Sequence, residues 1–207
     1  MTHYFSEDNN TLKSNPQVIA FSVNSTPLKF QTDNGVFSKN NFDRGTEVLL
    51  KYLVVDSSVK TVLDLGCGYG TIGIYMNKRY ELEVDMVDIN QRAIDLSIHN
   101  VELNNVAANV FKSDGFGNIE KKYNLIITNP PIRAGKELIY KFFSEAASYL
   151  EDDGVFCLVI NKKHGADSAI NYLNTIYGNV EILGKNKGFY VISCKINWQI
   201  DCIMILF

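Results

Sequence analysis

Val62-Leu63-Asp64-Leu65-Gly66-Cys67-Gly68-Tyr69-Gly70 is the stretch of sequence that decides the fold. Its first four residues are apolar except for one acid and indicate a buried strand. Three glycines follow, and a helical pattern then runs from Thr71 to Lys78. A strand that enters a glycine-rich turn and then a helix lets backbone amides approach a nucleotide-like ligand. The stretch therefore predicts a Rossmann-like α/β domain.

Strand-like runs alternate with helical patterns along the rest of the chain. The expected strands are 61–65, 84–87, 106–111, 123–128, 155–160, 180–183 and 189–194. The expected helices are one that starts after Asp43, then 71–78, 91–103, 136–150 and 166–177. This alternation predicts a seven-stranded, mostly parallel sheet with helices on both faces. Residues 184–188 are too few for a parallel crossover, so the last strand is expected to run antiparallel.

The 207 residues are expected to form one main domain with an extension at each end. Residues 1–36 form the N-terminal extension, in which runs at 18–23 and 28–32, separated by Asn24-Ser25-Thr26-Pro27, indicate a β-hairpin. Residues 37–196 form the main domain. Residues 197–207 are an atypically apolar tail that packs as an extra strand, mediates self-association or is poorly ordered. A homodimer is therefore left open.

Composition excludes several classes of protein. The N-terminus lacks the basic and apolar regions of a signal peptide, and no window approaches the roughly 20 apolar residues of a membrane span, which indicates a cytoplasmic protein without a membrane partner. Cys67, Cys157, Cys194 and Cys202 lie far apart, so neither a disulfide framework nor a metal site is expected. A net charge of −3 argues against broad coating of nucleic acid but permits local basic patches.

The acid before the glycine loop indicates which ligand the loop binds. Gly68-x-Gly70-x-x-Gly73 also matches the dinucleotide fingerprint, so an NAD-dependent oxidoreductase is one alternative. Asp64 would repel a pyrophosphate on the loop, whereas it would attract the ammonium of a methionine moiety. This favours S-adenosylmethionine as the cofactor. The candidate contacts in the loop are Asp64, Gly66, Cys67, Gly68 and Gly70.

Two further acids follow the next two strands. Asp88 comes about 20 residues past the loop, where such folds place the acid that accepts hydrogen bonds from ribose hydroxyls. Ile89 is expected to pack on the adenine face. Asp114, after the third strand, is placed to accept from the adenine amino group. Together these residues predict the nucleoside part of the cofactor site.

Asn129-Pro130-Pro131 closes the fourth strand and carries the candidate chemistry. Two prolines fix φ and remove two donors, so the carbonyls of Asn129 and Pro130 can be held toward one point. Acceptors at that point would hold an exocyclic amine with its nitrogen aimed at the methyl group, and catalysis would be largely alignment. The intact Asn-Pro-Pro also disfavours a non-catalytic cofactor-binding module.

The loop Leu63-Asp-Leu-Gly-Cys-Gly-x-Gly70 resembles the first motif of class I S-adenosylmethionine-dependent methyltransferases. With Gly-Val-Phe-Ser at 35–38, Asp-Arg-Gly-Thr at 43–46 and Asn-Pro-Pro-Ile-Arg-Ala-Gly-Lys at 129–136, residues 4–195 resemble the short, single-domain members of the 16S rRNA guanine-N2 methyltransferase family. The resemblance implies methylation of the N2 amine of a guanine and makes Phe37 and Thr46 candidate cofactor contacts. Adenine N6 and a protein glutamine N5 remain alternatives.

The resemblance also implies an RNA partner, either small-subunit rRNA or the 30S particle. Ile132 occupies the position where many amino-methyltransferases place an aromatic residue that stacks on the base, so apolar contact there or stacking from elsewhere is expected. Basic residues fall in segments at the carboxyl edge of the sheet, where they suit phosphate contact. The candidate substrate contacts are Ile132, Arg133, Lys162 and Lys163, with Lys136, Lys185 and Lys187 near the same edge.

Overall fold

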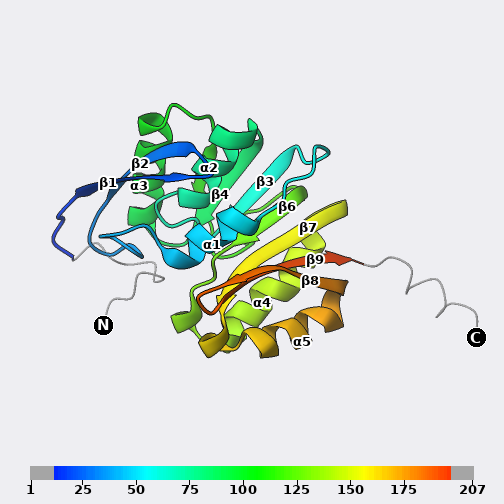
Figure 1. The fold of residues 1–207 in the computed structure, drawn as a ribbon. Coiled ribbons are helices and arrows are strands. Elements are labelled where there is room, and N and C mark those ends of the chain that lie inside the picture. The colour runs from blue at the N-terminus through cyan, green and yellow to red at the C-terminus, as the bar shows by residue number, and fades with distance from the viewer. Residues whose placement is uncertain (1–11, 197–207) are drawn as a thin grey trace, which may run out of the picture.

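The computed structural model describes residues 12–196 and contains the predicted seven-stranded sheet (Figure 1). The strands are β3 (Thr61–Leu65), β4 (Glu83–Asp88), β5 (Asn109–Lys112), β6 (Tyr123–Thr128), β7 (Leu150–Asn161), β8 (Gly178–Asn186) and β9 (Phe189–Ile196). Their order is β5-β4-β3-β6-β7-β9-β8, and β3 to β7 pair in parallel. The last strand, β9, is antiparallel to both β7 and β8, as predicted from the short connection before it.

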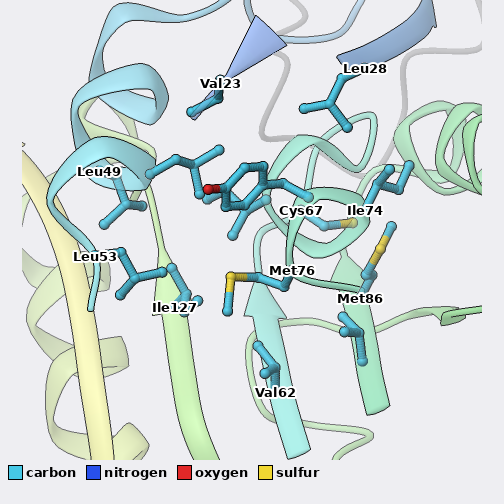
Figure 2. Packing of buried hydrophobic residues seen from close by; sticks show 14 of the residues in the cluster. Val23, Leu28, Leu49, Leu53, Val62, Cys67, Ile74, Met76, Met86 and Ile127 are labelled. Atoms are coloured by element: carbon cyan, nitrogen blue, oxygen red, sulfur yellow. The ribbon is translucent and has the colours of Figure 1, made fainter. Parts of the chain in front are cut away.

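Helices cover both faces of the sheet. They are α1 (Arg44–Tyr52), α2 (Thr71–Tyr80), α3 (Gln91–Leu103), α4 (Lys136–Ala146) and α5 (Ala166–Tyr177), with short 3-10 turns η1 (Ile132–Ala134), η2 (Ala147–Tyr149) and η3 (Lys162–His164). Residues of α1, α2 and α3 belong to one core, part of which Figure 2 shows, with Leu49 of α1 and Met76 of α2 facing Val62 and Ile127 of the sheet. Residues of α4 and α5 form a second core on the opposite face.

The prediction of a helix over 136–150 was too long. The helix ends at Ala146, and Leu150 is the first residue of β7, where it pairs with Tyr123 and is 1% exposed. Leu150 matched the helical spacing because a buried residue is apolar in either kind of element. The strand expected at 106–111 likewise begins only at Asn109, and β7 is longer than the expected 155–160.

The predicted hairpin is present as β1 (Gln17–Val23) and β2 (Thr26–Thr32), which form a separate two-stranded sheet. Its turn is only Asn24-Ser25, with φ of 47° and 65°, so it is tighter than the four-residue connection expected. Positive φ at both positions is typical of the type I′ turn, whose twist suits two-residue hairpins. Val23, Leu28 and Phe30 are buried in the first core, so the hairpin packs on the main domain.

Asn100 of α3 and Asn104, the C-cap of that helix, fasten the hairpin. The side chain of Asn100 accepts from Gln31 N at 2.7 Å and donates to Gln31 O at 2.9 Å. Asn104, one turn later, makes the same pair of bonds to Lys29, at 3.1 and 2.7 Å. Because each amide pairs with both backbone groups of one residue, the two side chains substitute for a neighbouring strand along β2.

Among residues 12–196, no helix is long and apolar enough to cross a membrane. Cys67, Cys157 and Cys194 are buried free thiols, so the described cysteines form no disulfide, and burial raises the pKa of each. The expectations for the apolar tail at 197–207 and for Cys202 lie outside the described residues.

Candidate functional site

A pocket lies at the carboxyl ends of β3, β4 and β6, where a parallel sheet is expected to bind its ligand. It brings together residues that the sequence places far apart. The predicted site residues that line it are Phe37, Thr46, Gly66, Cys67, Gly68, Asp88, Ile89, Asp114, Asn129, Pro130 and Pro131.

The glycine loop forms one wall of this pocket. Gly66 and Gly68 have φ of 74° and 58°, a left-handed conformation that favours glycine. A Cβ on either glycine would meet no atom within 4 Å, so the space beside their backbone is open. The amides of Gly66 and Cys67 both donate to Val87 O at 2.9 Å, which ties the loop to β4.

Asp88 at the end of β4 organises the loop as well as the pocket. Its Oδ2 accepts from Gly68 N and its Oδ1 accepts from Asn90 N, each at 2.9 Å. Burial raises the pKa of this carboxyl group, while the backbone donors oppose that rise. A carboxylate oxygen has a second lone pair, so both oxygens can also accept from ribose hydroxyls. Ile89 and Asp114 line the pocket beside it, where the adenine contacts were predicted.

We expect Asp88→Ala to weaken binding of S-adenosylhomocysteine about 10- to 100-fold. The substitution removes charge-assisted acceptors and releases the Gly68 amide, and each such hydrogen bond contributes about 1.5–3 kcal/mol. Calorimetric titration measures the change. Asp95→Ala is the matched control, because Asp95 is exposed on α3, accepts from Gln91 Nε2 and lies outside the pocket. Equal affinity of wild type and Asp88→Ala would remove Asp88 from the site.

Asp64 lies beneath the loop rather than in the lining of the pocket. It is 0% exposed, and its Oδ2 accepts from Gly73 N of α2 at 2.8 Å. Its Oδ1 is buried without a hydrogen-bond partner among the described residues. Burial raises the pKa of this carboxyl group to about 7. Asp64 therefore holds the loop to α2, and its contact with the methionine ammonium stays a prediction.

The side chain of Asn129 is held by the start of α1. Its Nδ2 donates to Asp43 Oδ2 at 2.9 Å and to Thr46 Oγ1 at 3.0 Å. The same Asp43 oxygen caps α1 by accepting from Thr46 N at 2.7 Å. An ionised carboxylate only accepts, so the amide nitrogen must face Asp43. The two hydrogens are thus occupied, and Asn129 Oδ1 remains as an acceptor. The sequence had indicated Asp43 only as a helix cap and Thr46 as a cofactor contact.

Six predicted site residues do not line the pocket. Besides Asp64, these are Gly70, Ile132, Arg133, Lys162 and Lys163. Gly70 is the N-cap of α2, with φ of 96°. Ile132 is half-buried and packs against the second core, whereas Arg133, Lys162 and Lys163 are exposed in the turns η1 and η3.

The structure adds lining residues that the sequence had not indicated as part of the site. These are Val36, Asp43, Leu65, Tyr69, Thr71, Ile72, Val87, Asn90, Ala93, Ser113, Gly115, Leu138 and Phe142. Phe142 lies in the helix expected over 136–150, and its helical spacing fits the core face of that helix. Periodicity marks a side chain as covered but does not say whether protein or ligand covers it.

The chain is similar to known proteins over most of its length. Residues 27–193 match the model of the methyltransferase small domain family. An uncharacterized protein of Bacillus subtilis, YbxB, is 37% identical over 197 residues, covering 93% of this chain and 98% of the relative. Ribosomal RNA small subunit methyltransferase C of Psychromonas ingrahamii is 35% identical over 181 residues, covering 84% of this chain and 50% of the relative.

A solved structure agrees with these sequence relatives. The T. thermophilus 16S rRNA N2 methyltransferase RsmC, in complex with AdoMet and guanosine, has a TM-score of 0.80 at 25% identity and covers 88% of this chain and 51% of that chain. The chain spans about half the length of the small subunit methyltransferase C relatives. The fold, the S-adenosylmethionine cofactor and the resemblance drawn from the sequence motifs are confirmed. This chain belongs to the methyltransferase small domain family.

Proposed function

We propose that this protein transfers the methyl group of S-adenosylmethionine to the exocyclic N2 amine of a guanine in small-subunit ribosomal RNA. The observation that carries the proposal is the orientation of Asn129. With both amide hydrogens bound by Asp43 and Thr46, its Oδ1 is an oriented acceptor at the wall of the cofactor pocket. Methyl transfer to an exocyclic amine depends on such an acceptor more than on a general base.

The residues present fit the cofactor. The open space beside Gly66 and Gly68 would accommodate the methionine portion, and the carboxylates of Asp88 and Asp114 would accept from the ribose and the adenine amino group. When bound, S-adenosylmethionine supplies an electrophilic methyl group on sulfonium. Asp64 is fully buried beneath the loop, where its carboxylate would attract a cationic ligand. These groups lie in the glycine loop, in β3 and at the end of β4, and in the loop after β5.

Asn129 and Pro130 then align the nucleophile. Asn129 Oδ1 and the Pro130 carbonyl accept the two N–H groups of the exocyclic amine, which turns the nitrogen lone pair toward the methyl group. The C–S bond of the bound cofactor would break as the N–C bond forms, and the amine nitrogen would become acidic only after it has bonded carbon. The proton then leaves to water or a neighbouring acceptor. Positioning of this kind supplies much of the rate enhancement in transfer reactions.

The choice of RNA and of guanine rests on two supports. Relatives at about 35% identity are named ribosomal RNA small subunit methyltransferase C, and the T. thermophilus relative is titled an N2 methyltransferase. Three basic residues are exposed at the same edge of the sheet as the pocket: Arg133, Lys162 and Lys163. There they are suited to contact RNA phosphates. The reaction is proposed to take place in the cytoplasm. Adenine N6 and a protein glutamine N5 present the same two hydrogens and remain the competing acceptors.

The test is to incubate the protein with methyl-labelled S-adenosylmethionine and separate pools of naked small-subunit rRNA, 30S particles, tRNA, DNA and protein. Nucleosides and amino acids are then identified by mass spectrometry. We expect N2-methylguanosine from the rRNA or the 30S pool. N6-methyladenosine or methylglutamine would replace the proposed acceptor by one of its competitors. Tight binding of NAD with none of S-adenosylmethionine would overturn the proposal altogether.

A further inference from the structure

An aromatic ring lies beside Asn129 at the start of β9. A Cβ placed on Gly45 would lie 3.1 Å from Phe189 Cε1 and 3.4 Å from Asn129 Nδ2. The ring edge and the amide therefore border the same small space. Because Gly45 has no side chain, it lets them approach each other there. Phe189 was not among the residues that the sequence analysis assigned to the site.

The backbone fixes the place of this ring. Lys187 and Gly188, with φ of 48° and 85°, form a two-residue turn that closes the hairpin of β8 and β9. Gly188 O accepts from Lys162 N at 2.7 Å, and Phe189 pairs with Asn161 at the end of β7. Phe189 thus stands at the carboxyl edge of the parallel strands, next to the exposed lysines of η3. Its side chain packs on the first core and is half-buried.

No aromatic residue of the Asn-Pro-Pro loop competes for the role of stacking on a base. Ile132 is aliphatic and packs on the second core. The ring of Phe142 is engaged elsewhere, because its Cε1 would lie 2.7 Å from a Cβ on Gly115, beside Asp114 at the adenine side of the pocket. Phe189 is a half-buried ring that lies on the same side of Gly45 as the amide of Asn129.

We propose that the ring of Phe189 is the surface on which the target base stacks while Asn129 Oδ1 receives its amine. This inference rests on the proposed function and specifies its substrate: a nucleotide that is unpaired, or is extruded from its helix, because only an unstacked base exposes a face to a side chain. Lys162, whose backbone amide donates to Gly188 of the same hairpin, and its neighbour Lys163 then contact the phosphates beside that nucleotide.

Binding of guanosine tests the proposal without any RNA. The protein is saturated with S-adenosylhomocysteine and titrated with guanosine, and the guanosine H8 resonance is followed by NMR. A base stacked on a phenyl ring shows an upfield ring-current shift. We expect Phe189→Leu, which keeps apolar packing on the core, to abolish that shift and weaken guanosine binding about tenfold or more, the scale of a lost stacking contact. Phe189→Tyr should retain both.

Two controls separate stacking from folding. Affinity for S-adenosylhomocysteine should be equal in wild type and both Phe189 variants. Tyr172→Leu is the matched aromatic control, because Tyr172 is half-buried on α5, stacks on Tyr140 with ring centroids 4.2 Å apart and lies outside the pocket. It should bind guanosine as the wild type does. With an RNA substrate, kcat/KM should fall in Phe189→Leu and be rescued in Phe189→Tyr.

The outcomes distinguish this inference from the proposed function. Loss of the ring-current shift in Phe189→Leu, together with absence of methylation in every pool, would uphold the stacking surface and refute the proposed reaction. Methylation of rRNA by a Phe189→Leu variant with wild-type guanosine affinity and kcat/KM would uphold the proposed reaction and refute the stacking surface. Failure of the wild type to bind guanosine at all would overturn the stacking surface.

Discussion

Asn129→Ala is expected to lower the single-turnover rate of methyl transfer about 100-fold or more, while affinity for S-adenosylmethionine stays within a few-fold of wild type. The substitution removes the acceptor that aligns the amine, and loss of one preorganised hydrogen-bonding group costs roughly 10²–10³ in rate. The cofactor site is built mainly from the glycine loop, Asp88 and Asp114, which remain intact. Rapid mixing of enzyme, cofactor and substrate RNA measures the rate.

A matched asparagine stands on the strand that precedes Asn129. Asn124 lies at the opposite end of β6, where its Oδ1 accepts from Lys60 N at 2.9 Å and from Thr61 N at 3.1 Å. Asn124→Ala should therefore lose stability but methylate at the wild-type rate well below its melting temperature. If cofactor affinity and rate fell together in Asn129→Ala, Asn129 would chiefly shape the pocket. If neither changed, the amine acceptor would have to be sought elsewhere.

Asn129→Asp tests whether the orientation of the side chain matters in addition to the presence of an acceptor oxygen. An aspartate at this position keeps an acceptor oxygen but loses the amide hydrogens that Asp43 and Thr46 bind. It also places a second carboxylate beside Asp43, and like charges at this distance repel. We expect its rate to remain well below that of the wild type, which would show that Asp43 and Thr46, at the start of α1, contribute by orienting the amide.

The sequence predicts best those parts of the site that are local. Gly66 and Gly68 need positive φ, and Asp88 ends the strand after the loop, so each is marked by neighbours in the chain. The alternation of strands and helices likewise defines the sheet and its antiparallel last strand. These features depend on residue type and spacing, which are visible without coordinates.

The contacts that complete the site are between distant segments. Asn129 meets Asp43 across 86 positions of sequence, and nothing in either motif indicates that pairing. Phe189 reaches the same space from the last hairpin, through a register that only the folded sheet defines. Phe142 carried a helical periodicity that fits core and pocket equally well. In each case the missing information is which surface a side chain meets, because local patterning reports burial alone.

Asp64→Asn is expected to become more stable relative to the wild type as the pH rises from about 5 to about 8, by roughly 2–3 kcal/mol in the free energy of unfolding. Burial raises the pKa of Asp64 from 3.8 to about 7 in the folded protein. The folded state therefore binds the proton more tightly than the unfolded state. Stability from this group is fully present below about pH 4 and is lost as the pH rises through 7. Each unit of difference between the pKa values of the folded and unfolded states corresponds to 1.36 kcal/mol in the free energy of unfolding.

The comparison depends on the change with pH rather than on stability at one pH. Asparagine can keep the hydrogen bond from Gly73 N, but its Nδ2 would then occupy the buried place where Oδ1 has no partner among the described residues. That cost is the same at every pH, because asparagine does not titrate. Urea unfolding of the cofactor-free protein at a series of pH values therefore isolates the ionisation of Asp64.

Asp85 provides the contrasting variant on the neighbouring strand. It is also buried, but Lys121 Nζ lies 3.0 Å from its carboxylate and the Tyr123 hydroxyl donates to it at 2.6 Å. Its charge has partners that stabilise it, so Asp85→Asn should lower stability near neutral pH. Parallel pH profiles for wild type and Asp64→Asn would mean that Asp64 is ionised at little cost beneath the loop. A widening gap would instead identify an uncompensated buried charge, which a cationic cofactor is suited to neutralise.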